Sequence, residues 1–209
     1  MSKPAIQVWG LTKHFNGVRA VEGLDFSVPE GTTLGLLGGN GAGKTTTLSM
    51  LVGLLLPTQG EIRVLGEDML RNRYRVLPYL NYSSPYLDLP HRLTVRQNLS
   101  VFAGLYGLKD AKGTLARLAG ELNLTAFMNR PYRELSSGQR TRVSLAKSLL
   151  NEPRILLLDE PTASMDPDMA DFMRGYLMAY QKRTGATVLL ASHNMTEVER
   201  LCQDVVILR

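Results

Sequence analysis

The stretch LLGGNGAGKTTTL, residues 36–48, decides the fold of this chain. It matches the pattern GxxxxGK followed by Ser or Thr, from Gly38 to Thr45, between the strand-like TTLGLL and the helix-like TTTLSMLVGLLL. Glycines let several backbone amides converge on phosphate oxygens, and the N-terminus of the following helix also favours an anion. The stretch therefore predicts a phosphate-binding loop rather than a plain glycine-rich turn.

The positions of this loop have distinct expected roles toward a nucleotide. Lys44 would place its charge on the β- and γ-phosphates, and the hydroxyl of Thr45 would help to hold a magnesium ion that bridges them. We therefore expect a nucleotide and Mg²⁺ as ligands. The residues expected to bind the nucleotide are Gly38, Gly39, Asn40, Gly41, Ala42, Gly43, Lys44, Thr45 and Thr46.

Composition and charge narrow the class of protein. The 209 residues are 44% hydrophobic and 21% charged, which is ordinary for a soluble globular protein, and one compact domain over residues 1–209 is the simplest interpretation. The net charge of +5 is scattered, with only RNRYR at 71–75 resembling a cluster, so we expect no nucleic-acid partner. The single cysteine, Cys202, excludes an intrachain disulfide. No apolar run is long enough to span a membrane.

The order of expected elements predicts an α/β fold. Strands are expected at 5–10, 24–28 and 32–37, with HFNGVRAVEG as a turn region between the first two, and a helix is expected to follow the loop to about Leu56. RILLLDE, ATVLLAS and DVVILR are typical of strands, the first of them buried and parallel. We therefore predict a P-loop NTPase core with a mostly parallel sheet and a small antiparallel β subdomain beside it.

Helical periodicity marks an insertion in this core. TVRQNLSVFAGLYG, KGTLARLAGELNL and RTRVSLAKSLLN place apolar residues at helical intervals, so a helical subdomain is expected over about residues 82–150. A later helix is expected from Pro167 to Thr184, capped by Asp166 and ended by Gly185. Asn194 with Glu197 three residues on predicts the start of a last helix.

Two further motifs carry candidate chemistry. The buried strand ends in adjacent carboxylates, of which Asp159 could hold Mg²⁺ directly or through water and Glu160 could orient or deprotonate an attacking water. The stretch LSSGQ, residues 135–139, puts two hydroxyls and a glycine at the start of a helix, where a phosphate could bind. The same residues would also serve as an ordinary helix cap.

The phosphate loop, LSSGQ and ILLLDEP in this order resemble the nucleotide-binding domain of ATP-binding-cassette (ABC) transporters, over nearly the whole chain. The resemblance implies an ATPase that uses ATP and Mg²⁺ and works as a head-to-tail dimer, with each ATP between the phosphate loop of one subunit and the LSSGQ of the other. It implies adenine stacking on Phe15 and a catalytic switch role for His193 beside Glu160. The residues implied at the dimer-completed site are Ser136, Ser137, Gly138, Gln139 and Asp166.

The resemblance also implies partners and a location. We expect a second copy of this chain and separate transmembrane permease subunits, which would hold the chain at the cytoplasmic face of the cell membrane. TVRQNLSVFAGLYG resembles the helical insertion of exporters. Two alternatives stay open: a non-transport ABC protein acting on the ribosome or DNA, for which the stretch between Lys44 and Leu135 is short, and an ATP-binding regulatory module with little turnover.

The sequence departs from the family pattern at several positions. Where the family carries a glutamine between core and helical subdomain, this chain has Ser84 or Pro85, and Gln97 lies too far along to replace it. Hydrolysis is therefore expected to be slower or coupled differently. Gly39 stands where proline is common and Ser137 where the first glycine of the signature is usual. Family members usually continue beyond a strand like DVVILR, so we expect this chain to be a shortened version of a longer protein.

Overall fold

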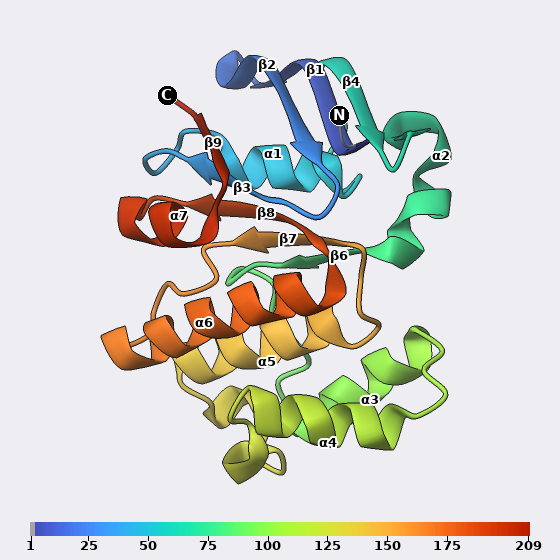
Figure 1. Ribbon diagram of the computed structural model, residues 1–209, viewed down its shortest axis with the longest axis vertical. Helices are drawn as coiled ribbons and strands as arrows, with labels where there is room; N and C mark the ends of the chain where they lie inside the picture. The colour runs from blue at the N-terminus through green and yellow to red at the C-terminus, as the bar shows by residue number, and fades with distance from the viewer. Residues whose placement is uncertain (1–2) are drawn as a thin grey trace.

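The computed structural model describes residues 3–209, and its main sheet is parallel (Figure 1). The five strands lie in the order β6-β7-β8-β3-β9, and every neighbouring pair is parallel. The two central strands β7 and β8 are buried along their whole length, which explains their even hydrophobicity. The strands are β3 (Thr33–Leu37), β6 (Leu80–Ser83), β7 (Ile155–Asp159), β8 (Thr187–Ser192) and β9 (Asp204–Ile207).

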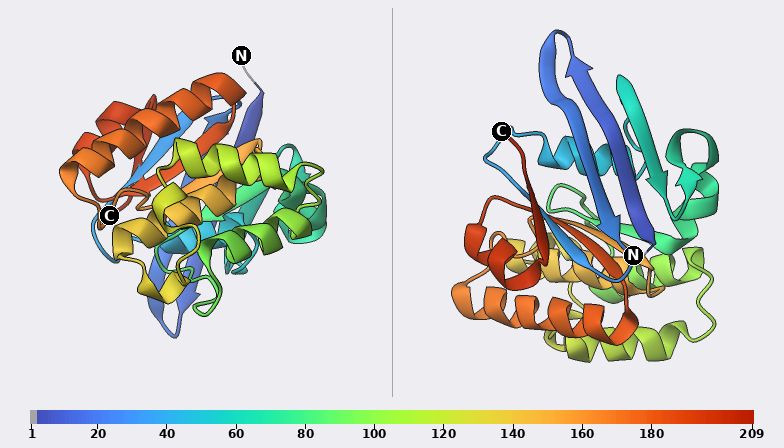
Figure 2. Two further views of the ribbon diagram at one scale, coloured as in Figure 1. Left: turned by 90° about the horizontal axis from the view of Figure 1, so that it is seen from below. Right: turned by 45° about the horizontal axis from the view of Figure 1, so that its top comes forward.

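A small antiparallel sheet lies above this core, as the sequence predicted, but its first hairpin is much longer than expected (Figure 2). Only Asn16 and Gly17 turn, both at positive φ, so the prediction of a turn region over HFNGVRAVEG is wrong. Its polar residues lie on strands whose far ends project from the core and face solvent. The strands are β1 (Pro4–Phe15), β2 (Val18–Pro29), β4 (Gln59–Val64) and β5 (Glu67–Asp68).

Helices cover both faces of the parallel sheet (Figure 1). Helix α1 (Lys44–Leu51) lies between the two sheets, while α5 (Ser137–Leu149), α6 (Pro167–Thr184) and α7 (Met195–Leu201) lie on the other side. The prediction that α1 runs to about Leu56 is wrong, because the chain turns at Gly53, where φ is 72°, and Leu54 and Leu56 are exposed. By contrast, α6 has the predicted bounds, with Asp166 accepting a hydrogen bond from the Met169 amide.

Two helices between β6 and β7 in the chain pack on the side of α5 and α6 that faces away from the parallel sheet (Figures 1 and 2). They are α3 (Val95–Leu105) and α4 (Ala111–Glu121), followed by the 3₁₀ turns η2 (Thr125–Phe127) and η3 (Tyr132–Glu134). Ahead of them, α2 (Met69–Val76) and η1 (Leu77–Tyr79) connect the small sheet to β6 and were not anticipated. Within residues 3–209, no helix combines the length and the hydrophobicity that crossing a bilayer requires.

Two hydrophobic clusters share the parallel sheet. Ile155 and Leu157 belong to the cluster between the two sheets, whereas Leu156 and Leu158 belong to the cluster with the helices below. This alternation follows from the twofold side-chain period of a strand. The backbone of β7 is therefore fixed from both faces, which makes its carboxyl end a rigid mount for Asp159.

Candidate nucleotide site

The phosphate loop connects β3 to α1 and opens a pocket of about 260 Å³, lined by residues 40–46, Tyr86, Asp159 and Glu160. Gly43 has φ 91°, and a Cβ there would come within 2.3 Å of the carbonyl oxygen of Ala20, so only glycine fits. The loop is also tied to the end of β8, because the Gly38 amide donates to the carbonyl of Ser192 at 3.3 Å. The loop is thus held between the hairpin and the sheet.

Lys44 is almost fully buried and turns back onto its own loop. Its Nζ donates to the carbonyl oxygens of Gly38 at 2.7 Å and Gly39 at 3.0 Å, and lies 3.7 Å from Oε1 of Glu160. An ammonium group has three hydrogens that can turn toward new acceptors. Phosphate oxygens entering this pocket would therefore compete for the same cation.

Asp159 collects three hydroxyl donors on a single carboxylate oxygen. Thr45 donates to Oδ2 at 2.8 Å, and Tyr82 and Ser84 donate to the same atom at 3.3 Å. Burial raises the pKa of Tyr82 to about 12, so this phenol stays protonated and can donate. Burial also raises the pKa of Asp159, against the opposing effect of these hydrogen bonds.

The other carboxylate oxygen of Asp159 fits a magnesium ion. In the described part of the chain, Oδ1 is buried and has no hydrogen-bond partner, which is costly unless something binds it. Mg²⁺ prefers carboxylate and hydroxyl oxygens, and Asp159 and Thr45 supply both next to the phosphate loop. Within residues 3–209, no group of three or more acidic, histidine or cysteine side chains is arranged to hold a metal ion.

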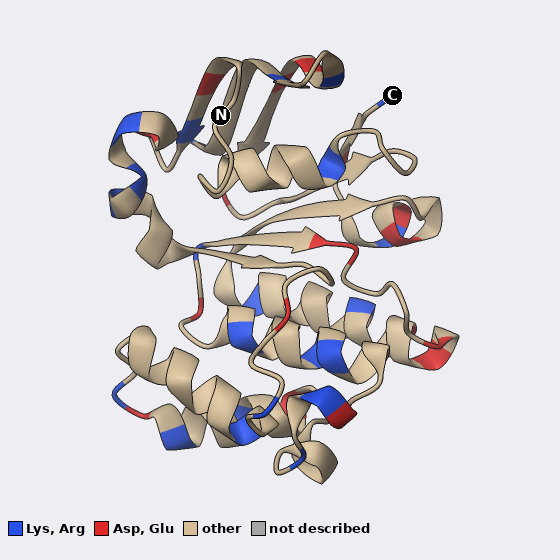
Figure 3. Ribbon diagram, turned by 180° about the vertical axis from the view of Figure 1, so that it is seen from behind, with Lys and Arg blue, Asp and Glu red and all other residues tan. Residues whose placement is uncertain are grey.

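Glu160 lies between the phosphate-loop lysine and the predicted switch histidine. Its Oε2 is 2.9 Å from Nδ1 of His193, and its Oε1 faces Lys44. Figure 3 colours the ribbon by charge and includes the end of β7, where Asp159 lies next to Glu160, and the start of α1 at Lys44. Glu160 has φ 49°, unusual for a residue with a side chain, and its amide donates to the carbonyl of Ala191 at 2.8 Å. The structure thus brings Lys44, Glu160 and His193 together.

The LSSGQ residues lie apart from this pocket within one chain. Ser136 and Gln139 form a capping box at the start of α5, with hydrogen bonds of 3.3 Å and 3.0 Å. Ser137 lines a separate pocket of about 430 Å³, and Gly138 packs near the carbonyl of Ser164. Among the described residues, those lining the phosphate-loop pocket include neither LSSGQ nor Asp166. The two sets of candidate residues therefore face different spaces.

Of three aromatic residues, Tyr86 lines the phosphate-loop pocket and Tyr82 contacts Asp159, whereas Phe15 is not among the described residues that line the pocket. Phe15, the expected adenine platform, is 42% exposed at the end of β1, with Nζ of Lys13 at 5.0 Å from its ring centre. Tyr82 and Tyr86 were missed by sequence reasoning, although both lie near the position where the glutamine was missing. The feature that could have revealed them is the short strand β6, because its carboxyl end lies beside that of β7 in the parallel sheet.

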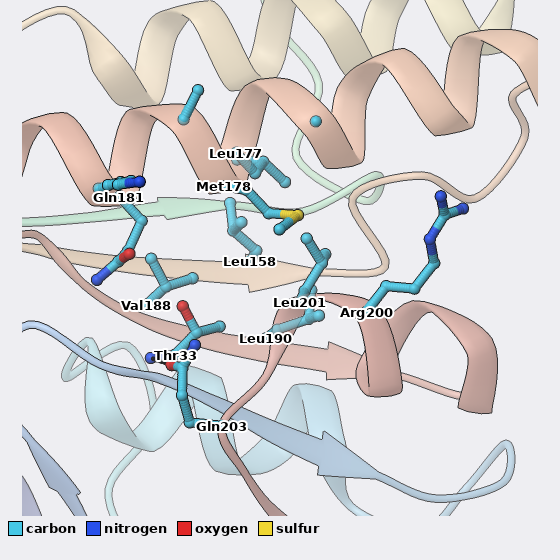
Figure 4. Close-up of a pocket in the computed structure, with 13 residues that line it drawn as sticks. Thr33, Leu158, Leu177, Met178, Gln181, Val188, Leu190, Arg200, Leu201 and Gln203 are labelled. Carbon is cyan, nitrogen blue, oxygen red and sulfur yellow. Dashed lines mark hydrogen bonds between the residues drawn. The ribbon is translucent and has the colours of Figure 1, made fainter.

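A larger pocket of about 460 Å³ lies between α6, α7 and the sheet (Figure 4). Its walls are mostly apolar, with Leu158, Leu177, Val188 and Leu190 pointing into it. Among the described residues, its lining contains none of the predicted site residues. The convergent polar groups of the molecule lie at the phosphate loop instead.

The chain matches one protein-family model and several curated proteins that bind ATP in transport systems. The family model described as "ABC transporter" matches residues 21–163. Nod factor export ATP-binding protein I of Ralstonia nicotianae is 37% identical, with 99% of this chain and 65% of the relative covered. The protein of the same name from Rhizobium sp. (strain N33) is 36% identical, with 100% and 69% covered. Probable multidrug ABC transporter ATP-binding protein YbhF of Escherichia coli is 38% identical, with 93% and 34% covered.

The chain spans only part of these relatives, 65% of the Ralstonia protein. Among solved structures, a dimeric ATP-binding cassette in a post-hydrolysis state with ADP and Pi has a TM-score of 0.90 at 20% identity, covering 98% of this chain and 94% of that one. The ATP-binding subunit of an ABC transporter has a TM-score of 0.88 at 27% identity, covering 98% and 86%. The first of these likenesses concerns the fold alone.

Proposed function

The chain belongs to the ABC transporter family, and we propose that it is a single ATPase domain that binds and hydrolyses ATP to drive a membrane exporter. The observation that carries the proposal is the meeting of Lys44, Asp159, Glu160 and His193 at one edge of the parallel sheet. The phosphate loop, a metal-binding carboxylate and a candidate base are the parts that phosphoryl transfer to water requires.

In this mechanism, Lys44 binds the β- and γ-phosphates after leaving the carbonyls of its own loop. Thr45 and Asp159 would hold Mg²⁺, which neutralises charge on the phosphates when bound. Glu160 orients an attacking water and accepts its proton through a carboxylate oxygen. His193, in contact with that carboxylate, holds it in place and reaches toward the γ-phosphate.

The proposal includes a head-to-tail dimer of two copies of this chain. Support comes from the position of Ser136, Ser137, Gly138 and Gln139, which lie at a helix start outside the phosphate-loop pocket. A second subunit would bring its own LSSGQ against the ATP, and Asp166, at the start of α6, would lie near the junction. Phe15 would then stack on the adenine.

Light scattering of Glu160→Gln with and without MgATP tests this assembly. We expect the mass in solution to double when MgATP is added, because the variant binds nucleotide but hydrolyses it slowly. The same variant with ADP is the control and should stay monomeric. A monomer under all conditions would contradict the shared site.

Separate permease subunits are the proposed membrane partners, at the cytoplasmic face of the membrane. A groove of about 490 Å³ between the core and the inserted helices offers them an apolar contact, lined by Leu54, Tyr74, Leu87, Tyr106 and Lys147. Leu54 and Tyr74 are 69% and 73% exposed, which is unusual for large apolar side chains in one groove. The export direction is supported by the relatives named for Nod factor export and multidrug transport.

The groove leads to a test of the permease contact. Tyr74→Glu should reduce recovery of the chain with its membrane subunits by about tenfold or more, because aromatic side chains often dominate interfaces. MgATP binding should stay unchanged, since Tyr74 does not line the phosphate-loop pocket. Met178→Glu, which changes an exposed apolar residue on α6 outside the groove, is the control. Equal recovery of both variants would exclude this groove as the contact.

A second candidate is an ATP-binding regulatory module with little turnover, favoured by Ser84 in place of a longer amide side chain. Its hydroxyl contacts Asp159 but is too short to extend across the pocket toward a nucleotide. Phosphate release by the assembled complex decides between the two functions. A wild-type rate no higher than that of Glu160→Gln would favour the regulator.

A further inference from the structure

Glu197 is a buried carboxylate that the mechanism above leaves unused. It lies in the first turn of α7 and is only 1% exposed. Its Oε1 accepts a hydrogen bond of 2.6 Å from the hydroxyl of Thr162, and its Oε2 accepts one of 2.6 Å from the hydroxyl of Ser192. Short bonds of this kind are typical of charge-assisted pairs, and they offset the cost of burying a carboxylate.

The two hydroxyls belong to the two segments that carry the proposed catalytic residues. Thr162 follows Glu160 by two positions, and Ser192 is the last residue of β8, directly before His193. Both hydroxyl residues are buried, at 8% and 0% exposure. One carboxylate therefore links the segment after β7 to the segment after β8.

The bond to Ser192 also decides what Glu160 can bind. The single hydrogen of Ser192 Oγ has two possible acceptors, Oε2 of Glu197 at 2.6 Å and Oε2 of Glu160 at 3.5 Å. The hydrogen is donated to Glu197, the closer acceptor. The amide of Asn194 donates to Oγ of Ser192 at 3.0 Å, which helps to orient this hydroxyl. Oε2 of Glu160 is thus left to His193.

The anchored segment reaches the start of α5 as well. Ser164 lies two residues beyond Thr162, and its carbonyl oxygen would stand 3.2 Å from a Cβ placed on Gly138. A shift of the segment after β7 would therefore press on the LSSGQ stretch. Holding this segment in place matters both for Glu160 and for the surface that carries LSSGQ.

We propose that Glu197 is a positioning residue of the nucleotide site, which keeps Glu160 and His193 in register by binding Thr162 and Ser192. The inference rests on the proposed ATPase function and deepens it. Glu197 touches neither nucleotide nor water in this role. Its effect passes through two hydroxyl groups, and these can be removed without changing any charge.

Thr162 supplies a matched pair of variants. Thr162→Val keeps the shape of the side chain and loses the hydroxyl, whereas Thr162→Ser keeps the hydroxyl and loses a methyl group. We expect Thr162→Val to lower kcat for phosphate release by about tenfold, with the KM for ATP within about twofold of wild type. Thr162→Ser should stay within about twofold in both. The proposal would be overturned if Thr162→Ser lost as much of its kcat as Thr162→Val. It would also be overturned if both variants kept the wild-type kcat.

Hydrogen–deuterium exchange without nucleotide gives a second readout that does not need turnover. In Thr162→Val, exchange should rise in both segments, 160–166 and 191–195, because the same carboxylate holds both. Thr162→Ser should exchange like wild type. Faster exchange in 160–166 alone would overturn the link between the segments. If wild-type protein released no phosphate, the ATPase function would fail, while the exchange comparison would still decide the role of Glu197.

Discussion

Replacing Glu160 with glutamine is expected to lower the rate of phosphate release by about two to four orders of magnitude, the usual contribution of a positioned general base. Glutamine keeps the shape of the side chain but cannot accept a proton from water. The carboxylate is held by His193 at 2.9 Å, and 3.7 Å separates it from Lys44, so the substitution changes the reacting group more than its surroundings. Single-turnover phosphate release measures the rate of hydrolysis, and a nucleotide titration measures the affinity for MgATP.

The affinity for MgATP should stay within about threefold in Glu160→Gln, because the base acts on water and not on the bound phosphates. Glu199→Gln is the matched control, since Glu199 is an exposed glutamate on α7. It should hydrolyse ATP like wild type. Unchanged phosphate release in Glu160→Gln would remove Glu160 from the chemistry, and His193 with Lys44 would then need another explanation.

Elements with signals at both ends were predicted closely. Helix α6 has an aspartate cap, a proline in its first turn and a terminal glycine, and its observed bounds of Pro167–Thr184 are the predicted ones. The strand β7 was recognisable because it lies inside the sheet between β6 and β8, where both faces select apolar residues. Local chemistry and tertiary position agree in these segments.

Elements whose form depends on distant contacts were missed. The strand β6 is only four residues long and takes its place by pairing with β7, seventy-odd residues later in the chain, which no local pattern reveals. The β1–β2 hairpin keeps its strand geometry through residues that look like turn formers, because cross-strand hydrogen bonds extend beyond the core. An apolar run likewise suggested a longer α1, although Leu54 and Leu56 are exposed.

The candidate site divides in the same way. Lys44, Asp159 and His193 could be named from motifs and their order. In the structure Lys44 and Asp159 line one pocket, and His193 contacts Glu160, which also lines it. The hydroxyls of Tyr82 and Ser192 could not be assigned a role, because they act through sheet neighbours rather than through sequence neighbours. Their contacts depend on which strand ends meet at the edge of the sheet.

Lys44→Ala is expected to weaken MgATP binding by about 10- to 100-fold, because a hydrogen bond to a charged group contributes about 1.5–3 kcal/mol. The buried Nζ donates hydrogen bonds to the carbonyls of Gly38 and Gly39. Its removal leaves these carbonyls without that donor and leaves no lysine cation in the loop to contact the phosphates. Isothermal titration of nucleotide measures the change, and Lys112→Ala, which removes an exposed lysine of α4, is the control. Glu160→Gln should keep its affinity for MgATP and lose the rate of phosphate release, whereas Lys44→Ala should lose affinity. Equal MgATP affinities of the two variants in the titration would contradict the separate roles of phosphate binding and water activation.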